Sequence, residues 1–435
     1  MSSNSNPRNY KRSQNDCLIL VLYSSFRVVT FLDFLQGTWE RYLALSPIGE
    51  RQSSPQSLLP KSLVRSHVNV NLYVQDPESD IPTTESIHEP FDHNMIIVTG
   101  GAGFVGSNLV KELNNRGLTN IIIVDDMTDG SKFRNLVDCK IADFIDASAF
   151  REMIRTKSFT HRPRAIFHYG AITSTTATDG KAILDMNFTY PKELLHWCKD
   201  QGVRFIYASS AAVYGNGTNF DENAGLEAPL NIYGYSKMLF DQYMLRNVEP
   251  RSPQIVGLRL FNVYGPNEDH KGDMASAVYQ FYQVRKKFKV IQLFGDYDGV
   301  KGGEQKRDFV HVQDVARLNC WFLDHPEISG IFNVGTGVAT TFYDIATQVA
   351  KHFGEPEAYI KTVDFPAELK GQYKSYTCAN TSKLRRAGST LRFRGIKEGI
   401  KEYMEWLEEH DLSAKATPRS QYQSPANTTA KSQIK

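Results

Sequence analysis

The sequence contains few cysteines, almost no net charge and no long apolar run without charged residues. Its five cysteines (Cys17, Cys139, Cys198, Cys320 and Cys378) are scattered, and no two of them form a CxxC pair. An odd, scattered set argues against a disulfide framework and against zinc, and it fits reduced thiols in a reducing compartment. A formal net charge of +2 lacks the basic excess of a nucleic-acid-binding protein. We therefore expect neither a nucleic-acid partner nor a bound metal.

The two ends of the chain differ from its centre. The most apolar N-terminal stretch, 17–35, contains Arg27 and Asp33, which make a membrane span costly. This stretch fits a poor signal sequence, part of a targeting segment, or an upstream extension that the folded protein does not need. We expect residues 1–94 to be largely disordered or targeting sequence, and the polar tail 413–435 to be disordered.

The rest of the chain is organised around residues 95–117, MIIVTGGAGFVGSNLVKELNNRG. This stretch begins with an apolar run long enough for one buried strand, and from Ser107 its apolar residues recur at helical spacing. Between the two lie four glycines: Gly100, Gly101, Gly103 and Gly106. A strand, a glycine turn and a helix open a dinucleotide-binding fold, because the glycines let the pyrophosphate approach the helix N-terminus.

The next apolar run, 120–124, supports this interpretation because it ends in Asp125 and Asp126. Asp125 lies about twenty residues beyond the last glycine, where an acidic side chain takes the ribose hydroxyls. Lys132, in the following loop, is placed either to reach a 2′-phosphate or to be solvated. Because Asp125 favours NAD and Lys132 favours NADP, charge alone leaves both cofactors open.

The fold class that this pattern predicts is α/β, with a Rossmann-type doubly wound parallel sheet and a smaller C-terminal α/β substrate domain. We place the NAD(P)-binding domain at 95–265, with later strands returning to it, and the substrate-binding domain at 266–412. The length of 435 residues is sufficient for two domains with a full hydrophobic core.

Two further segments of this part are expected to meet the cofactor. A short buried strand, 165–168, leads into YGAITSTT, whose Gly170 and Ala171 suit a close approach. Ser174, Thr175 and Thr176 add hydroxyls that could hold sugar or phosphate oxygens, although an ordinary loop would look the same. Asn187 lies in a predicted helix that would cover the sheet.

A candidate catalytic group follows the strand 205–208, which ends in Ser209 and Ser210. Tyr233 and Lys237 come next at a spacing that puts both on one helix face. There the lysine ammonium would lower the pKa of the phenol, so that Tyr233 could act as a general acid or base. The same YxxxK spacing occurs at Tyr282 and at Tyr297, but neither follows a serine-ended strand.

Later segments contribute weaker candidates. Asn262 and Lys271 lie in a loop that leaves the sheet, where a lysine is usually solvated. Arg307 precedes a strand-to-helix step and is a candidate bidentate phosphate clamp.

Taken together, TGGAGFVG, SSAAVYG, YGYSK, FNVYGP and RDFVHVQDV resemble the extended short-chain dehydrogenase/reductases that act on nucleotide sugars. HYGAITSTT, APLNIYGYSK, FNVYGPNEDHKGDMAS and PAELKGQYKSYTCA narrow the resemblance to the ADP-L-glycero-D-manno-heptose 6-epimerases. The resemblance covers nearly all of 95–412. It implies a tightly held NADP (with NAD possible), transient oxidation at C6″ of the heptose, and two acid/base groups.

The resemblance also implies roles for particular residues. Tyr233 and Lys271 would be the two acid/base groups, Ser210 the hydroxyl partner, and Lys237 would hold the nicotinamide ribose. The expected cofactor contacts are Gly100, Gly103, Phe104, Val105, Gly106, Asp125, Asp126, Lys132, Tyr169, Gly170, Ala171, Ile172, Thr173, Asn187, Lys237 and Val263. The expected substrate contacts are Ser174, Thr175, Asn262, Phe294, Arg307 and Tyr373.

The sequence departs from the family pattern at four places. Asp273 replaces a serine, Gln280 replaces a histidine, Tyr169 replaces a glutamate, and an insertion lies around 297–303. Because a carboxylate near a diphosphate would repel it, Asp273 suggests that the sugar or its nucleotide could differ from the family's.

Several alternatives stay open on sequence alone. A nucleotide-sugar dehydratase would carry an Asp–Glu pair where this chain has Ala211 and Ala212, whereas a 4-epimerase is harder to exclude. A non-catalytic dinucleotide-binding regulator is disfavoured by the intact Ser210, Tyr233 and Lys237. The family resemblance suggests a cytoplasmic homo-oligomer with a small nucleotide-sugar substrate and no membrane partner.

Overall fold

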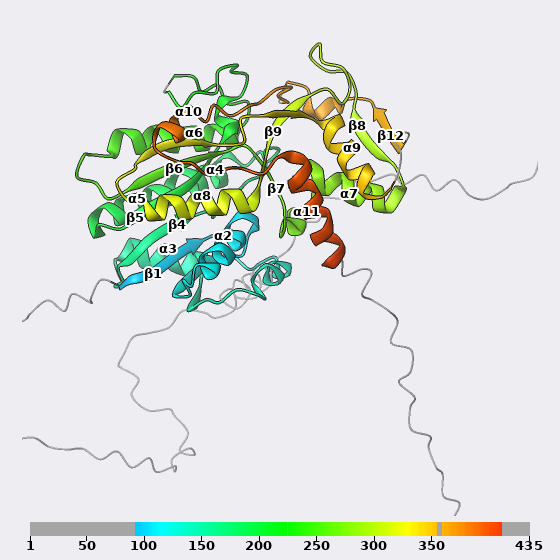
Figure 1. Cartoon of the computed structure of the whole chain (residues 1–435). Coiled ribbons are helices and arrows are strands. Elements are labelled where there is room, and N and C mark those ends of the chain that lie inside the picture. Colours follow the sequence, from blue (N-terminus) through cyan, green and yellow to red (C-terminus); the bar gives the residue numbers. More distant parts are fainter. Residues whose placement is uncertain (1–91, 224, 355–358, 372, 411–435) are drawn as a thin grey trace, which may run out of the picture. The chain divides into compact units, whose positions relative to one another are not determined.

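The computed structural model describes residues 92–410, apart from 224, 355–358 and 372 (Figure 1). All of these residues belong to one unit, 84–435. The segments for which we expected an extension and a disordered tail therefore fall almost entirely outside the described residues.

A seven-stranded, wholly parallel sheet forms the centre, in the order β10-β6-β5-β4-β1-β2-β3. Its strands are β1 (Asp92–Thr99), β2 (Ile121–Asp125), β3 (Asp143–Asp146), β4 (Pro163–His168), β5 (Arg204–Ser210), β6 (Ile255–Leu260) and β10 (Gly330–Val334). The order reverses between β1 and β4, where Val98 pairs with both Ile123 and Phe167. Ligands of open α/β sheets bind outside the carboxyl ends of the strands at such a point.

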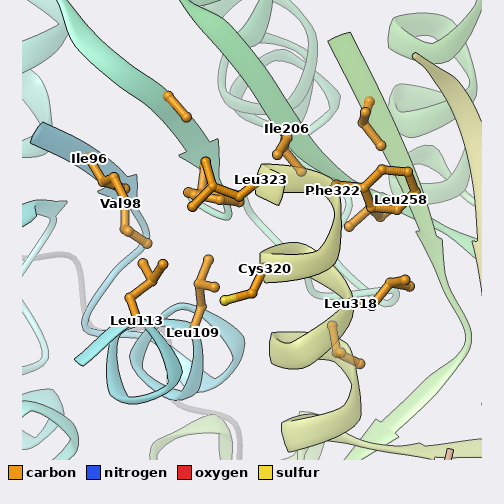
Figure 2. Close-up of a cluster of buried hydrophobic side chains, with 14 of the residues drawn as sticks. Ile96, Val98, Leu109, Leu113, Ile206, Leu258, Leu318, Cys320, Phe322 and Leu323 are labelled. Atoms are coloured by element: carbon orange, nitrogen blue, oxygen red, sulfur yellow. The ribbon is translucent and has the colours of Figure 1, made fainter. Parts of the chain in front are cut away.

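Helices cover both faces of this sheet, which explains why its inner strands are apolar throughout. They are α2 (Phe104–Asn115), α3 (Ala147–Thr156), α4 (Gly180–Leu184), α5 (Tyr190–Gln201), α6 (Ile232–Asn247), α8 (Val312–Asp324) and α10 (Ser382–Arg386). Ile96 and Val98 point to the face that α2 and α8 cover, as Figure 2 shows. The intervening Ile97 packs in the opposite core, formed with α3, α5 and α6. The predicted doubly wound α/β fold is confirmed.

The helix predicted around Asn187 is not continuous, because a π-helical turn, Asp185–Thr189, separates α4 from α5. The buried Asn187 side chain accepts a hydrogen bond from the Ile172 amide and donates one to the Ile172 carbonyl, both at 2.9 Å. Apolar periodicity carries no sign of such a turn. The π-helical turn carries Asn187, whose two hydrogen bonds fix Ile172 in the segment that follows β4.

Two smaller sheets are formed by strands that follow β6 in the sequence. One contains β7 (Asn262–Tyr264), β9 (Lys306–His311) and β11 (Ala339–Thr341), and the other β8 (Ile291–Phe294) and β12 (Ile360–Val363). Around them are α7 (Ala277–Phe288), α9 (Phe342–His352) and α11 (Ile396–Glu409), which enclose a third apolar core. Short 3-10 helices are η1 (Gly130–Leu136), η3 (Ala211–Tyr214), η4 (Asp269–Met274) and η6 (Ala367–Leu369). Within 92–410, apart from its gaps, no helix is long and apolar enough to cross a membrane.

Candidate active site

The glycine turn between β1 and α2 brings the chain close to itself at two positions. Gly100 has a φ of +68°, and a Cβ there would lie 2.5 Å from the amide nitrogen of Gly170. A Cβ on Gly106 would lie 2.1 Å from the carbonyl oxygen of Gly100. Because Gly103 is the N-cap of α2, no side chain caps this helix. Its first N–H groups are therefore left for an anion.

A cavity of about 700 Å³ opens at the carboxyl ends of β1, β4 and β5. Every residue that we expected to contact the cofactor lines it, apart from Asp126 and Asn187. The lining residues among them are Gly100, Gly103, Phe104, Val105, Gly106, Asp125, Lys132, Tyr169, Gly170, Ala171, Ile172, Thr173, Lys237 and Val263. Asn187 supports the cavity indirectly, because it holds Ile172. Asp126 is exposed, and its carboxylate accepts a hydrogen bond from the Thr128 amide at 2.8 Å.

Asp125 and Lys132 pair with each other. Lys132 Nζ lies 2.7 Å from one Asp125 oxygen, and the other oxygen accepts a hydrogen bond from the Ala102 amide at 2.8 Å. From the sequence, Asp125 was interpreted as favouring NAD and Lys132, independently, as favouring NADP. In the folded chain the ion pair neutralises the carboxylate, so Asp125 alone does not determine the charge at this end of the cavity.

Ser210, Tyr233 and Lys237 converge on the same cavity from β5 and α6. The N-cap Asn231 fixes the start of α6, because its side chain accepts a hydrogen bond from the Gly234 amide at 2.9 Å. The Lys237 ammonium donates to the Ala208 carbonyl at 3.0 Å, and burial lowers its pKa to about 8.

The expected lowering of the Tyr233 pKa by Lys237 is not found in the structure. Burial raises the pKa of Tyr233, and a hydrogen bond with Ser210 opposes that rise. The reason is that the phenol is withdrawn from water, which penalises the tyrosinate. Lys237 in turn donates one of its hydrogen bonds to the carbonyl of Ala208 on β5.

Lys271 reaches the same cavity from η4, where Gly272 has a φ of +53°. Burial lowers the pKa of Lys271, and the nearby Glu268 opposes that effect. Glu268 accepts hydrogen bonds from the Gly265 amide at 3.1 Å and the Ser276 hydroxyl at 2.8 Å, so it braces the loop that carries Lys271.

Two residues that depart from the family pattern lie beside this loop. The Gln280 amide donates to the Gly272 carbonyl at 2.8 Å and so supports the turn. Asp273 is exposed and lines neither of the two cavities at the site. The repulsion that we expected from its carboxylate therefore finds no support, because the side chain faces water.

A second cavity, of about 300 Å³, shares Thr175, Ser210, Tyr233 and Asn262 with the first. Arg307 and Tyr373 line it as expected, and Ser174 lines the first cavity. Arg307 is only 7% exposed, and its guanidinium carbon lies 4.8 Å from the centre of the Tyr373 ring. Its burial lowers its pKa.

Phe294 does not line either cavity, although we expected it to contact the substrate. Its ring packs on Phe365 and Tyr373, with centroid distances of 5.6 and 6.3 Å. Phe294 therefore packs against Tyr373, which lines the second cavity, without lining a cavity itself. Its place in β8, where side chains alternate, turns it outward.

Sequence reasoning missed Lys374, Asn231 and Thr377, which line the second cavity, and His270, which lines the first. Lys374 directly follows Tyr373 and His270 directly precedes Lys271, so adjacency to residues that had been singled out was the only available signal. Ala211 and Ala212 line the second cavity where a dehydratase would need its acidic pair.

Comparisons with known proteins agree with this geometry. Residues 96–335 match the NAD dependent epimerase/dehydratase family. An ADP-L-glycero-D-manno-heptose-6-epimerase of Alkalilimnicola ehrlichii is 51% identical over 311 residues, covering 72% of this chain and 97% of the relative. The same enzyme of Thiobacillus denitrificans is 49% identical over 324 residues, covering 72% and 98%.

The crystal structure of Helicobacter pylori ADP-L-glycero-D-manno-heptose-6-epimerase is 30% identical, with a TM-score of 0.64, and the match covers 73% of this chain and 97% of that one. A nicotinamide dinucleotide is the cofactor class of the matched family, and the glycine turn, the uncapped helix and the larger cavity fit it. The chain therefore belongs to the NAD dependent epimerase/dehydratase family, and within it to the ADP-L-glycero-D-manno-heptose-6-epimerases.

Proposed function

We propose that this protein interconverts ADP-D-glycero-D-manno-heptose and ADP-L-glycero-D-manno-heptose by transient oxidation at C6″. The observation that carries this proposal is that two acid/base candidates, Tyr233 and Lys271, line one cavity from different elements. An epimerisation of this kind calls for two such groups, because the C6″ hydroxyl loses its proton in one orientation and regains a proton in the other. The names of the relatives at about 50% identity supply the substrate.

The chain's own residues then handle protons and orientation. The bound nicotinamide dinucleotide supplies the hydride acceptor and donor. One of Tyr233 and Lys271 removes the hydroxyl proton at C6″, and the other returns a proton to the oxygen after the ketone has turned over. Ser210, hydrogen-bonded with Tyr233, polarises the substrate oxygen, and Lys237 holds the nicotinamide ribose.

We propose NADP rather than NAD as the dinucleotide. Lys132 neutralises Asp125, so the repulsion that a free carboxylate would exert on a 2′-phosphate is reduced. His270 lines the same cavity near Lys132; burial lowers its pKa, so it offers a phosphate a neutral imidazole and not a second positive charge. Mass analysis of the dinucleotide released from the denatured protein tests this directly, since recovery of NAD alone would contradict it.

We also propose the division into an NAD(P)-binding domain, 95–265, joined by later strands, and a substrate domain, 266–412. The return of β10 to the edge of the seven-stranded sheet supports it. A cytoplasmic homo-oligomer is proposed on family resemblance, and size measurement in solution tests the oligomer.

The experiment for the activity uses the full chain as purified. It is incubated with ADP-D-glycero-D-manno-heptose, and C6″ is followed by NMR without added cofactor. We expect the mixture to approach an equilibrium of the two epimers. A parallel incubation with UDP-glucose tests the 4-epimerase alternative, and conversion of UDP-glucose but not of the heptose would overturn the proposal.

A further inference from the structure

We propose that Lys374 is a substrate-binding residue that, together with Arg307, takes the diphosphate of the nucleotide sugar. The inference deepens the proposed function and rests on its assignment of the second cavity to the substrate. Lys374 was not among the residues that the motifs or the family resemblance pointed to.

Backbone pairing with β9 brings Lys374 next to Arg307. The Lys306 amide donates to the Ser375 carbonyl at 2.9 Å, and the Thr377 amide donates to the Lys306 carbonyl at 3.1 Å. This pairing places Tyr373 and Lys374 at the same edge as Arg307, and all three side chains line the second cavity. The position of Lys374 is therefore set by backbone hydrogen bonds of its segment to β9.

The charges of this cavity call for an anion. Arg307 and Lys374 both line it, and among the described residues that do so none is Asp or Glu. Burial, followed by repulsion from Arg307, lowers the pKa of Lys374, and Asp298, which does not line the cavity, opposes that shift. Two like charges held close together in a partly buried cavity destabilise one another, and a doubly charged diphosphate between them would reverse that effect.

The ammonium of Lys374 has donors left for a ligand. It carries three N–H groups, and one of them donates to the Gly217 carbonyl at 2.7 Å. That bond also ties the segment around Lys374 to the turn at 215–217, where Gly215 lines the cavity. A test must therefore separate binding of a phosphate from support of this turn.

The experiment measures binding of ADP by calorimetry to the full chain with its dinucleotide retained. Three variants are compared with the wild type: Lys374→Gln, Lys374→Arg and, as the matched control, Lys370→Gln. Lys370 is exposed, lies in the same segment and lines neither cavity. The released dinucleotide and the melting temperature are measured for every variant.

We expect Lys374→Gln to weaken ADP binding about tenfold, the loss typical of one charged hydrogen bond, with Lys374→Arg close to wild type. With ADP-heptose, KM should rise by a similar factor while kcat changes less than about twofold. Lys370→Gln should leave binding and both kinetic constants unchanged.

Equal ADP affinity of Lys374→Gln and wild type would overturn the proposal. So would a lower kcat with unchanged ADP affinity, because Lys374 would then only support the turn at 215–217. If the wild type binds ADP in a Lys374-dependent way but does not epimerise the heptose, the proposed function fails while the assignment of Lys374 stands.

Discussion

At the scale of single residues, burial decides the chemistry of this site more than the spacing of charges. The sequence places Tyr233 and Lys237 one helical turn apart, and this spacing suggested that the lysine would lower the pKa of the tyrosine. In the folded chain burial raises the pKa of the phenol and lowers that of the ammonium. Both shifts favour the neutral forms, so the phenol loses its proton less readily and the Lys237 ammonium more readily than the spacing alone predicts.

Replacing the phenol tests its role. We predict that Tyr233→Phe abolishes epimerisation, with a loss of at least about a hundredfold in kcat, because the proton acceptor is removed. The dinucleotide should remain bound, since the glycine turn is untouched. Turnover is followed by NMR, and the bound dinucleotide by absorbance after denaturation.

The chain provides a matched control for this substitution. Tyr282 begins the same YxxxK spacing on α7, but it is buried in the apolar core of the smaller part and lines neither cavity. Tyr282→Phe should keep full turnover. Loss of activity in both variants, or turnover retained in Tyr233→Phe, would contradict the role of Tyr233.

The pH dependence of the reaction should report on Lys237. Its pKa is lowered from 10.5 to about 8, so the ammonium is present below about pH 8 and is lost above it. We predict that kcat falls as the pH rises through about 8, because a neutral amine lacks the charge with which Lys237 is proposed to hold the nicotinamide ribose beside Tyr233. The measurement is kcat against pH, with melting temperatures taken at each pH. A kcat that stays constant to about pH 10, the ordinary range of a lysine, would show that this assignment is wrong.

At the scale of elements, a buried ionic network holds β5, β6 and α6 together. Asp241, one turn after Lys237 on α6, accepts hydrogen bonds from Ser209 of β5 at 2.8 Å and from Arg259 of β6 at 2.9 Å. A carboxylate oxygen of Glu227 lies 2.7 Å from Nη2 of Arg259 and forms a second ion pair with it. Because Ser209 precedes Ser210, this network fixes the serine relative to the helix that carries Tyr233.

Breaking this network should cost stability. We predict that Asp241→Asn lowers the free energy of unfolding by about 3–5 kcal/mol, because Arg259 and Asp241 are both fully buried. Asp185→Asn is the matched control, since Asp185 pairs with Arg151 but is 48% exposed. It should cost less than about 1 kcal/mol in the same denaturant titration. Equal losses in the two variants would contradict a special role for the buried pair.

The elements differ in how far the sequence predicts them. Strand β1, the glycine turn and α2 were predictable because their signal is local and uninterrupted. The π-helical turn at Asp185–Thr189 was not, because it depends on the contact between Asn187 and Ile172, which are held together only in the fold. Asp125 and Lys132 were found but interpreted as opponents, since a sequence does not show that their side chains pair.

At the scale of the whole molecule, the sheet brings together residues that lie far apart in the chain. The family pattern pointed to Arg307 and Tyr373, and both line the second cavity. Phe294 was placed on the wrong side of Tyr373, and Lys374 was overlooked. Both errors concern segments whose position depends on pairing with β9 or on aromatic packing, and neither leaves a trace in local spacing.

The fold should lose stability in acid through its buried histidines. His168, bonded to the Thr99 hydroxyl between β1 and β4, has its pKa lowered to about 3 by burial. The unfolded chain therefore binds a proton near pH 6.5 that the folded chain refuses until about pH 3, so stability falls as the pH drops through this window.

We predict that His168→Asn reduces the pH slope of the unfolding free energy in this window by about 1.4 kcal/mol per pH unit, which corresponds to one proton. The measurement compares denaturant titrations of the variant and the wild type at several pH values. Parallel curves for the two proteins would show that His168 does not contribute.

The central claim is that a hydride leaves C6″ and returns to its opposite face within one site. The most direct test is the fate of a label in ADP-D-glycero-D-manno-heptose that carries deuterium at C6″, incubated with the full chain in ordinary water. We predict that the L-glycero product retains the deuterium at C6″, because the hydride never exchanges with solvent. Replacement of the label by solvent hydrogen would contradict this account and would point to proton abstraction from carbon.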